Sequence, residues 1–217
     1  MSKLNQTQKI SIYLAVSLGL AIVYPVITKN SFGFIRSTAW LSILFLFLTL
    51  VPINIVKTIQ NPKLKKFVSV LASNRRVFGI VSGSIALIHS SFTIWQKYDF
   101  KLINLLTRET LPGSLANLIM LLMLSTSLFS VQRKFRNWKM LHSIVWLLVP
   151  LVFVHALLSE IYFVDVFSWI MFALIGFLLL LGVFKKFLKS ESRDYLRDLV
   201  LFLIGTLVSI SVFLFVK

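Results

Sequence analysis

The sequence contains no cysteine. Disulfide bonds, thiolate metal sites and thiol catalysis are therefore excluded. It also lacks a phosphate-binding loop of the GxGxxG or Walker type, and its longest stretch between apolar segments, residues 57–76, is too short for a nucleotide-binding unit. Apolar residues, by contrast, make up 58% of the chain, and the mean hydropathy is +0.89. This composition indicates a membrane protein.

Seven apolar segments are long enough to cross a hydrocarbon core of about 30 Å at about 1.5 Å per residue. They are residues 10–28, 38–56, 77–95, 112–131, 140–158, 163–184 and 198–216. The first follows Lys3 and Lys9, as a signal peptide would, but its apolar run is long and no small-x-small cleavage site follows, so we expect a retained signal anchor. The sequence predicts an all-α integral membrane protein, a six- to seven-helix transmembrane bundle forming a single domain over residues 1–217.

Acidic residues are scarce, with 7 Asp and Glu against 23 Lys and Arg and a formal net charge of +16. Of the basic residues, 17 lie before the first segment or in the second, fourth and sixth connections, and five lie in the other three connections. The positive-inside rule then predicts a cytoplasmic N-terminus. The charge is explained by topology and by contact with anionic lipid headgroups, and nucleic-acid binding is not expected.

Only three histidines occur, and all three fall in predicted membrane segments. With a cytoplasmic N-terminus, the third and fifth segments run in the same direction. His89 then lies about 20 Å and His155 about 24 Å from the cytoplasmic end of its helix, whereas His142 is only about 5 Å in. His89 and His155 are therefore at similar depth in the outer half of the bilayer.

Two interpretations of these histidines follow. An isolated imidazole in a membrane helix most often makes an interhelical hydrogen bond, worth about 0.6 kcal/mol. Two imidazoles at matching depth on different helices are also the usual axial ligands of a haem held in a bundle. The helical neighbours of His89 are Ala86, Ile85, Ser82 and Gly79. Three of the four are small, as a flat macrocycle would need and as plain helix packing would also favour.

Other chemistries fit less well. A zinc or non-haem iron site needs more ligands, and the acidic residues nearest the histidines, Glu160 and Asp165, lie in the connection after the fifth segment. A catalytic triad is not expected, because no carboxylate lies within one or two helical turns of His89 or His142.

Three stretches share their order and spacing with a known family. They are "LFLTLVPI" (46–53), "NRRVFGIVSGSIALIH" (74–89) and "LMLSTSLFSVQRKFRNWKMLH" (122–142), followed thirteen residues later by His155. Together they resemble the ferric reductase-like transmembrane domain superfamily. The resemblance is closest to the YedZ/MsrQ branch, the haem-binding membrane subunits of bacterial methionine sulfoxide reductase systems.

The resemblance implies a b-type haem between the third and fifth helices, with His89 and His155 as axial ligands of the iron. It places a ferric reductase-like core at about 38–184 and leaves 198–216 as an additional C-terminal helix. It also implies a location in the bacterial inner membrane. Two-haem relatives carry a further histidine thirteen residues before the first; Arg76 stands there in this sequence, so bis-histidine ligation of a second haem is not expected.

More than one role is open for His142 and for the two arginines before the third segment. His142 ligates a second haem with an unusual partner, contacts a propionate or a quinone, or lies at the membrane interface. Pro150, between His142 and His155, could kink the helix and change the angle between them. Arg75 and Arg76 contact a propionate or a flavin phosphate, such as that of FMN, or serve as topology charges.

The resulting prediction is an electron-transfer component of an oxidoreductase. Many relatives carry their own FAD and NADPH domain after the last helix, whereas this sequence ends at Lys217. We therefore expect a separate flavoprotein or quinol to donate electrons at the cytoplasmic face, where the basic stretch 57–76 could dock an acidic partner. The acceptor would be an extracytoplasmic reductase. The alternatives are a ferric or cupric reductase component with a metal-ion acceptor and a non-redox transporter or assembly protein.

Overall fold

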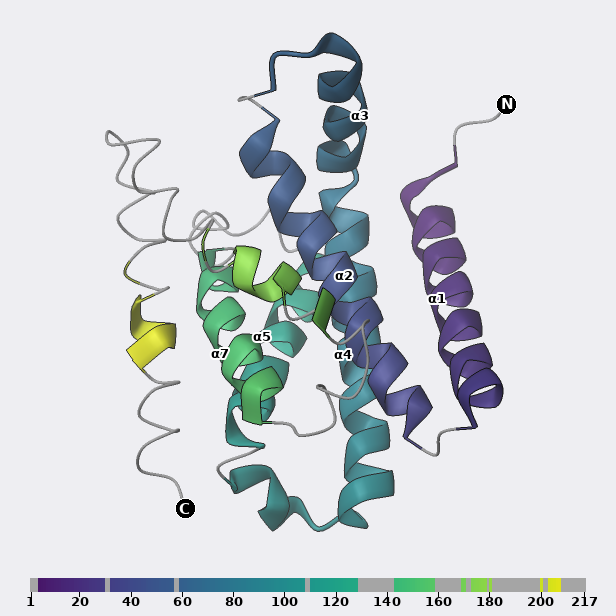
Figure 1. Ribbon diagram of the computed structural model, residues 1–217, viewed down its shortest axis with the longest axis vertical. Helices are drawn as coiled ribbons and strands as arrows, with labels where there is room; N and C mark the ends of the chain where they lie inside the picture. The colour runs from purple at the N-terminus through teal and green to yellow at the C-terminus, as the bar shows by residue number, and fades with distance from the viewer. Residues whose placement is uncertain are drawn as a thin grey trace. The chain divides into compact units, whose positions relative to one another are not determined.

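A computed structural model of the chain describes residues 4–29, 32–56, 59–107, 110–128, 143–158, 169–170, 173–178, 180, 200 and 203–207 (Figure 1). Over these residues the chain is helical and contains no strand, which confirms the predicted all-α class. The chain divides into two compact units, Met1–His89 and Ser90–Lys217, which we call the first and second unit.

The helices of the described residues are α1 (Gln6–Thr28), α2 (Gly33–Ile55), α3 (Pro62–Ser73), α4 (Arg75–Tyr98), the 3-10 helix η1 (Leu102–Leu106), α5 (Leu111–Leu128) and α7 (Val145–Leu158). Within the described part of the chain, α1, α2 and α4 are long and apolar enough to cross a membrane, while α5 and α7 are shorter apolar helices. The predicted segments 163–184 and 198–216 lie largely outside the described residues. The total of six or seven spans therefore remains a prediction.

Helix α1 begins with a capping box and then exposes an apolar surface. The side chain of Asn5 accepts a hydrogen bond from the Gln8 backbone N–H, and the side chain of Gln8 accepts one from the Asn5 N–H. Beyond this cap only Ser17 and Ala21 are buried, and many large apolar side chains are exposed, among them Ile12, Val16, Leu20 and Ile27. A helix with so much exposed apolar surface is suited to a lipid surround.

The long helices of the first unit alternate in direction (Figure 1). Lys9 Nζ, near the start of α1, donates to Asn74 Oδ1, immediately before α4, at 3.0 Å, so α1 and α4 begin at the same end. Helix α2 runs the opposite way. Ser42 Oγ donates to the Ser82 carbonyl at 3.2 Å, and Ser82 Oγ donates to the Ser42 carbonyl at 2.8 Å. This alternation is the arrangement that consecutive membrane crossings require.

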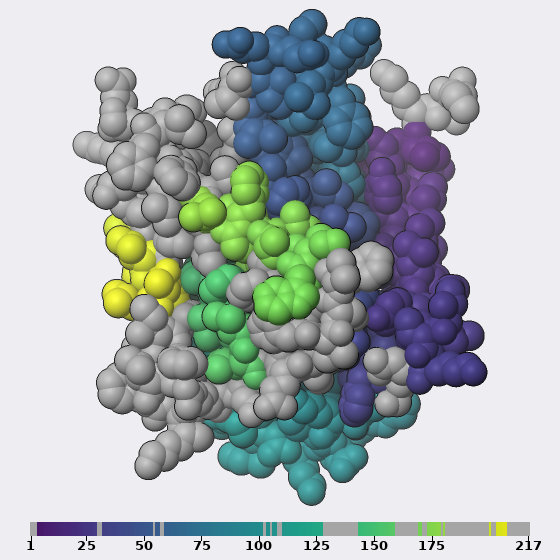
Figure 2. Space-filling view, in the orientation of Figure 1, coloured from purple at the N-terminus to yellow at the C-terminus, as the bar shows by residue number. Residues whose placement is uncertain are grey.

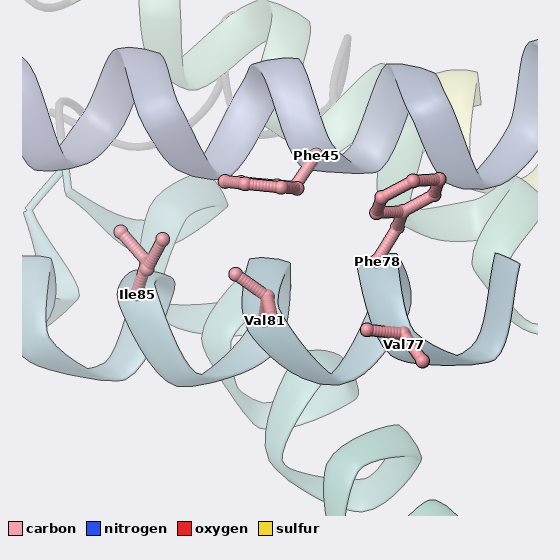
Figure 3. Close-up of a cluster of buried hydrophobic side chains, with 5 residues drawn as sticks. All are labelled: Phe45, Val77, Phe78, Val81 and Ile85. Carbon is pink, nitrogen blue, oxygen red and sulfur yellow. The ribbon is translucent and has the colours of Figure 1, made fainter. Parts of the chain in front are cut away.

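An apolar cluster fills the space between α2 and α4. Phe45 of α2 meets Val77, Phe78, Val81 and Ile85 of α4, and all five are buried (Figure 3). The ring of Tyr13 on α1 packs against Phe78, with centroids 5.6 Å apart, and against Phe45 at 6.2 Å. Three helices thus share one aromatic contact, which joins α1 to the α2–α4 pair.

The contact between the end of α1 and the start of α2 tolerates no side chain at Gly33. A Cβ added there would lie 2.8 Å from both Cα and Cβ of Pro25. Gly33→Ala is expected to destabilise the protein by about 1–3 kcal/mol, the usual cost of overpacking. Thermal unfolding followed by circular dichroism in detergent measures this effect. Gly19→Ala is the matched control, because nothing lies within 4 Å of its added Cβ; equal melting temperatures for the two variants would contradict the prediction.

Two boundaries differ from the sequence prediction. Helix α2 begins at Gly33 rather than at residue 38. The polar residues that suggested a connection are inside the fold: Ser37 Oγ donates to the Ala21 carbonyl of α1 at 3.1 Å, and Arg36 is buried. The stretch 57–76, predicted as a basic loop, contains helix α3. Its start is fixed by Asn61, whose side chain caps the helix, and by Pro62 in the first turn.

In the second unit α5 packs against α7. The start of α5 meets the end of α7, because Gly113 lies against the ring of His155. Among described residues farther along the chain, Gly205 lies against Pro150 and Leu147 of α7. Pro150 is accommodated inside α7 and is buried.

Candidate functional site

His89 lies in the second half of α4, against the first two turns of α2. Its Nδ1 lies 2.9 Å from the carbonyl oxygen of Ile35 and 3.5 Å from Thr38 Oγ1. A carbonyl oxygen can only accept a hydrogen bond, so Nδ1 must carry the proton. In the neutral ring the lone pair is then on Nε2.

This tautomer is the one that a metal-binding imidazole needs. Histidine ligands usually donate one ring N–H to a carbonyl or carboxylate, which fixes the ring and leaves the other nitrogen to bind the metal. The hydroxyl of Thr38 is occupied in its own helix, where it donates to the carbonyls of Phe34 and Ile35. The Ile35 carbonyl therefore joins Thr38 and His89 in one network. The hydrogen bond between His89 and Ile35 joins α4 to α2, so it is also the interhelical hydrogen bond expected of an isolated imidazole in a membrane helix.

The small residues beside His89 serve helix packing. Ser82 is fully buried and exchanges hydrogen bonds with Ser42. A Cβ added to Gly79 would lie 3.6 Å from Thr49 Cγ2 of α2, and Ile85 belongs to the cluster with Phe45. These contacts are the helix packing that was one of the two interpretations of this face, and the haem interpretation remains a prediction. His89 is at the end of that packed face, half-buried.

Arg36 also belongs to this region, although from its position in the sequence it is predicted to be a charge in the connection between the first two segments. It follows Ile35 directly in the first turn of α2 and is 6% exposed. Arg36 is thus a buried basic side chain one residue along α2 from the carbonyl that accepts from His89. A guanidinium can form paired hydrogen bonds with a carboxylate. The positive-inside rule assigns an arginine at the edge of an apolar segment to a connection, so the sequence did not predict that Arg36 is buried.

His155 lies near the end of α7, half-buried, with α5 against its ring. A Cβ added at Gly113 would come within 2.7 Å of His155 Nδ1 and Cε1 and 2.9 Å of its Cγ. Only glycine allows the α5 backbone this close to the imidazole. Because Gly113 has no side chain, the His155 ring can lie against the α5 backbone at this position.

The other predicted site residues are placed as follows. His142 lies outside the described residues. Arg75 is exposed and Arg76 half-buried at the start of α4. Thirteen helical residues separate Arg76 from His89, which is about 20 Å along the axis. The structure therefore does not bring Arg76 and His89 together.

His89 closes the first unit and His155 belongs to the second, so their predicted pairing across one cofactor remains a prediction. In the part of the chain that the structure describes, no group of three or more His, Cys, Asp or Glu residues lies close enough to hold a metal ion. Comparisons with known protein families, with curated proteins and with solved structures each find no match.

Proposed function

We propose that this protein is a membrane electron-transfer subunit that binds a b-type haem through His89 and His155. The observation that carries the proposal is the bond from His89 Nδ1–H to the Ile35 carbonyl, because it puts the ring in the tautomer of a metal ligand. It fits the resemblance to the ferric reductase-like superfamily, in which these two positions carry the axial ligands. The bundle would have six or seven spans, with the haem between the third and fifth.

The residues around the two histidines have definable tasks. The Ile35 carbonyl accepts from the His89 ring, the Thr38 hydroxyl lies beside that bond, and Gly113 makes room for the His155 ring. Arg36, which is buried and follows Ile35 in α2, would bind a propionate of the haem, because a guanidinium can pair with a carboxylate. Bound in this way, haem supplies one-electron transfer, whose potential depends on ligand identity, burial and hydrogen bonding.

The proposed direction of transfer is from the cytoplasmic side to the extracytoplasmic side of a bacterial inner membrane. The donor would be a separate flavoprotein or a quinol, and the acceptor an extracytoplasmic reductase, as in methionine sulfoxide reductase systems. A ferric or cupric reductase component would use the same residues with a metal ion as acceptor. His142 and Arg76, near the donor side in this orientation, remain candidates for contact with a quinone, a flavin phosphate or a second haem.

The decisive measurement is the absorption spectrum of the protein purified in detergent from haem-sufficient cells. A Soret band and reduced-minus-oxidised α and β bands of a low-spin b haem are expected. A colourless, folded preparation would contradict the proposal. It would favour a non-redox membrane protein in which the His89–Ile35 bond only joins two helices.

A further inference from the structure

Helix α3 is a short amphipathic helix with a well-defined start. Asn61 Oδ1 accepts hydrogen bonds from the backbone N–H groups of Lys63 at 3.0 Å and Leu64 at 3.2 Å, and Pro62 occupies the first turn. The sequence PKLKKFVSVLAS contains three lysines and no acidic residue. Its charge is therefore entirely positive.

The apolar side of α3 is divided between the protein interior and the outside. Val68 is buried, and α3 packs against α2. Leu64, Phe67 and Val70 are spaced three residues apart and form one stripe, which is 51%, 61% and 56% exposed. In Figure 2 the atoms of this part of the chain, in blue, are uncovered on the face in view. Within the first unit, α3 therefore buries Val68 and leaves the stripe of Leu64, Phe67 and Val70 exposed.

The lysines lie next to this stripe in a definite order. At about 100° per residue, Val68 is followed around the axis by Leu64, Phe67, Lys63, Val70 and Lys66, and Lys65 lies nearly opposite Phe67. All three lysines are exposed. The surface of α3 therefore changes from buried to exposed apolar to basic across one side of the helix. The remaining side carries the exposed residues Lys65, Ser69 and Ser73.

Both ends of α3 are tied to candidate membrane spans. Residues 56–61 connect it to α2, and Asn74 alone separates it from α4. The helix is thus confined to the end of the α2–α4 pair, where a bilayer surface would lie. Helices with an exposed apolar stripe and lysines beside it lie in the headgroup region, with the apolar side chains at the acyl boundary and the ammonium groups near phosphates.

We infer that α3 is a binding surface for anionic phospholipid, with Leu64, Phe67 and Val70 inserted at the acyl boundary and Lys63 and Lys66 on the lipid phosphates. Charge complementarity selects anionic over zwitterionic lipid, and each lysine near an anionic surface strengthens binding by about fivefold. Lys65 remains in water. This inference is independent of haem, because it uses no residue of the proposed haem site.

The absence of cysteine makes the inference directly testable in the full chain. A nitroxide attached to Phe67→Cys, and separately to Lys65→Cys, reports its depth in proteoliposomes through its collisions with oxygen and with a water-soluble nickel chelate. With phosphatidylglycerol added to phosphatidylcholine, the label at 67 should gain oxygen contact and lose nickel contact, while the label at 65 should stay accessible to nickel. Val70→Cys provides a second position if Phe67→Cys does not fold.

Paired charge variants complete the test. Lys63→Gln with Lys66→Gln should remove the effect of phosphatidylglycerol on the label at 67. Lys97→Gln with Lys101→Gln should leave it unchanged, because those exposed lysines lie at and beyond the other end of α4. The inference is overturned if the labels at 67 and 70 are nickel-accessible in both lipid mixtures. It is also overturned if they become protected only when a soluble protein partner is added, which would assign the stripe to that protein.

Discussion

Replacing His89 or His155 with alanine is expected to remove the haem spectrum from the purified protein, whereas His142→Ala retains much of it. Either of the first two changes deletes one of the two proposed axial nitrogens. The loss of the His89–Ile35 hydrogen bond alone would cost only about 0.6 kcal/mol, so the His89→Ala protein should stay folded. Haem content per protein, from the pyridine haemochrome spectrum, measures the effect.

Two controls separate ligation from folding. His89→Asn keeps a side-chain amide that can donate to the Ile35 carbonyl but provides no imidazole for iron, so it should lose haem as His89→Ala does. Added imidazole should restore low-spin haem to His89→Ala, because the free ligand can replace the deleted side chain. Full haem content in His89→Ala or in His155→Ala would refute the assignment of that residue.

Gly113→Ala is expected to lower haem retention strongly without altering either histidine. The added Cβ would lie 2.7 Å from two atoms of the His155 ring, so the ring or the α5 backbone must move. Overpacking of this kind costs about 1–3 kcal/mol, roughly 5- to 160-fold in a binding constant if the strain is relieved when haem leaves. The measurement is haem loss to apomyoglobin, which captures the cofactor as it dissociates.

Gly176→Ala is the matched control in the same unit, because nothing lies within 4 Å of its added Cβ. It should hold haem as the parent protein does and gain up to about 1 kcal/mol in helix stability. If Gly113→Ala and Gly176→Ala release haem at the same rate, contact with Gly113 does not position a haem ligand. Matching circular dichroism spectra would show that both variants remain helical.

Hydropathy and length were sufficient to predict most of the described helices. Predicted segments 10–28, 77–95 and 112–131 correspond to α1, α4 and α5, because uninterrupted apolar runs leave few alternative boundaries. The start of α2 was missed because Arg36 and Ser37 look like surface residues in sequence. Their burial depends on α1 and on the fold around them, which a residue-by-residue hydropathy scale does not contain.

Helix α3 was missed for a different reason. At twelve residues it is too short to span a membrane, and its three lysines resemble the basic charges of a cytoplasmic loop. The sequence does contain helix signals: Asn61 and Pro62 at the start, and apolar residues three positions apart at 64, 67 and 70. These signals predict a helix, but the lysines were interpreted as topology charges and the stretch was therefore predicted to be a loop.

For the candidate site, the sequence identified the histidines but not what holds them. The acceptor for His89 is the backbone carbonyl of Ile35, and every residue has such a carbonyl. Only the packing register of α2 against α4 selects one of them. The contact between Gly113 and the His155 ring could not be predicted either, because a glycine in an apolar segment can have many roles.

The paired hydrogen bonds between Ser42 and Ser82 make α2 and α4 a hairpin that resists axial sliding. A slip of one turn, about 5.4 Å, would break both bonds, and the hydrocarbon core offers no water to replace them. In a bilayer thinner than the hydrophobic length of the hairpin, the two helices would therefore tilt together. The distance from His89 to the bilayer surface would then follow the tilt angle, while its contact with Ile35 stays the same.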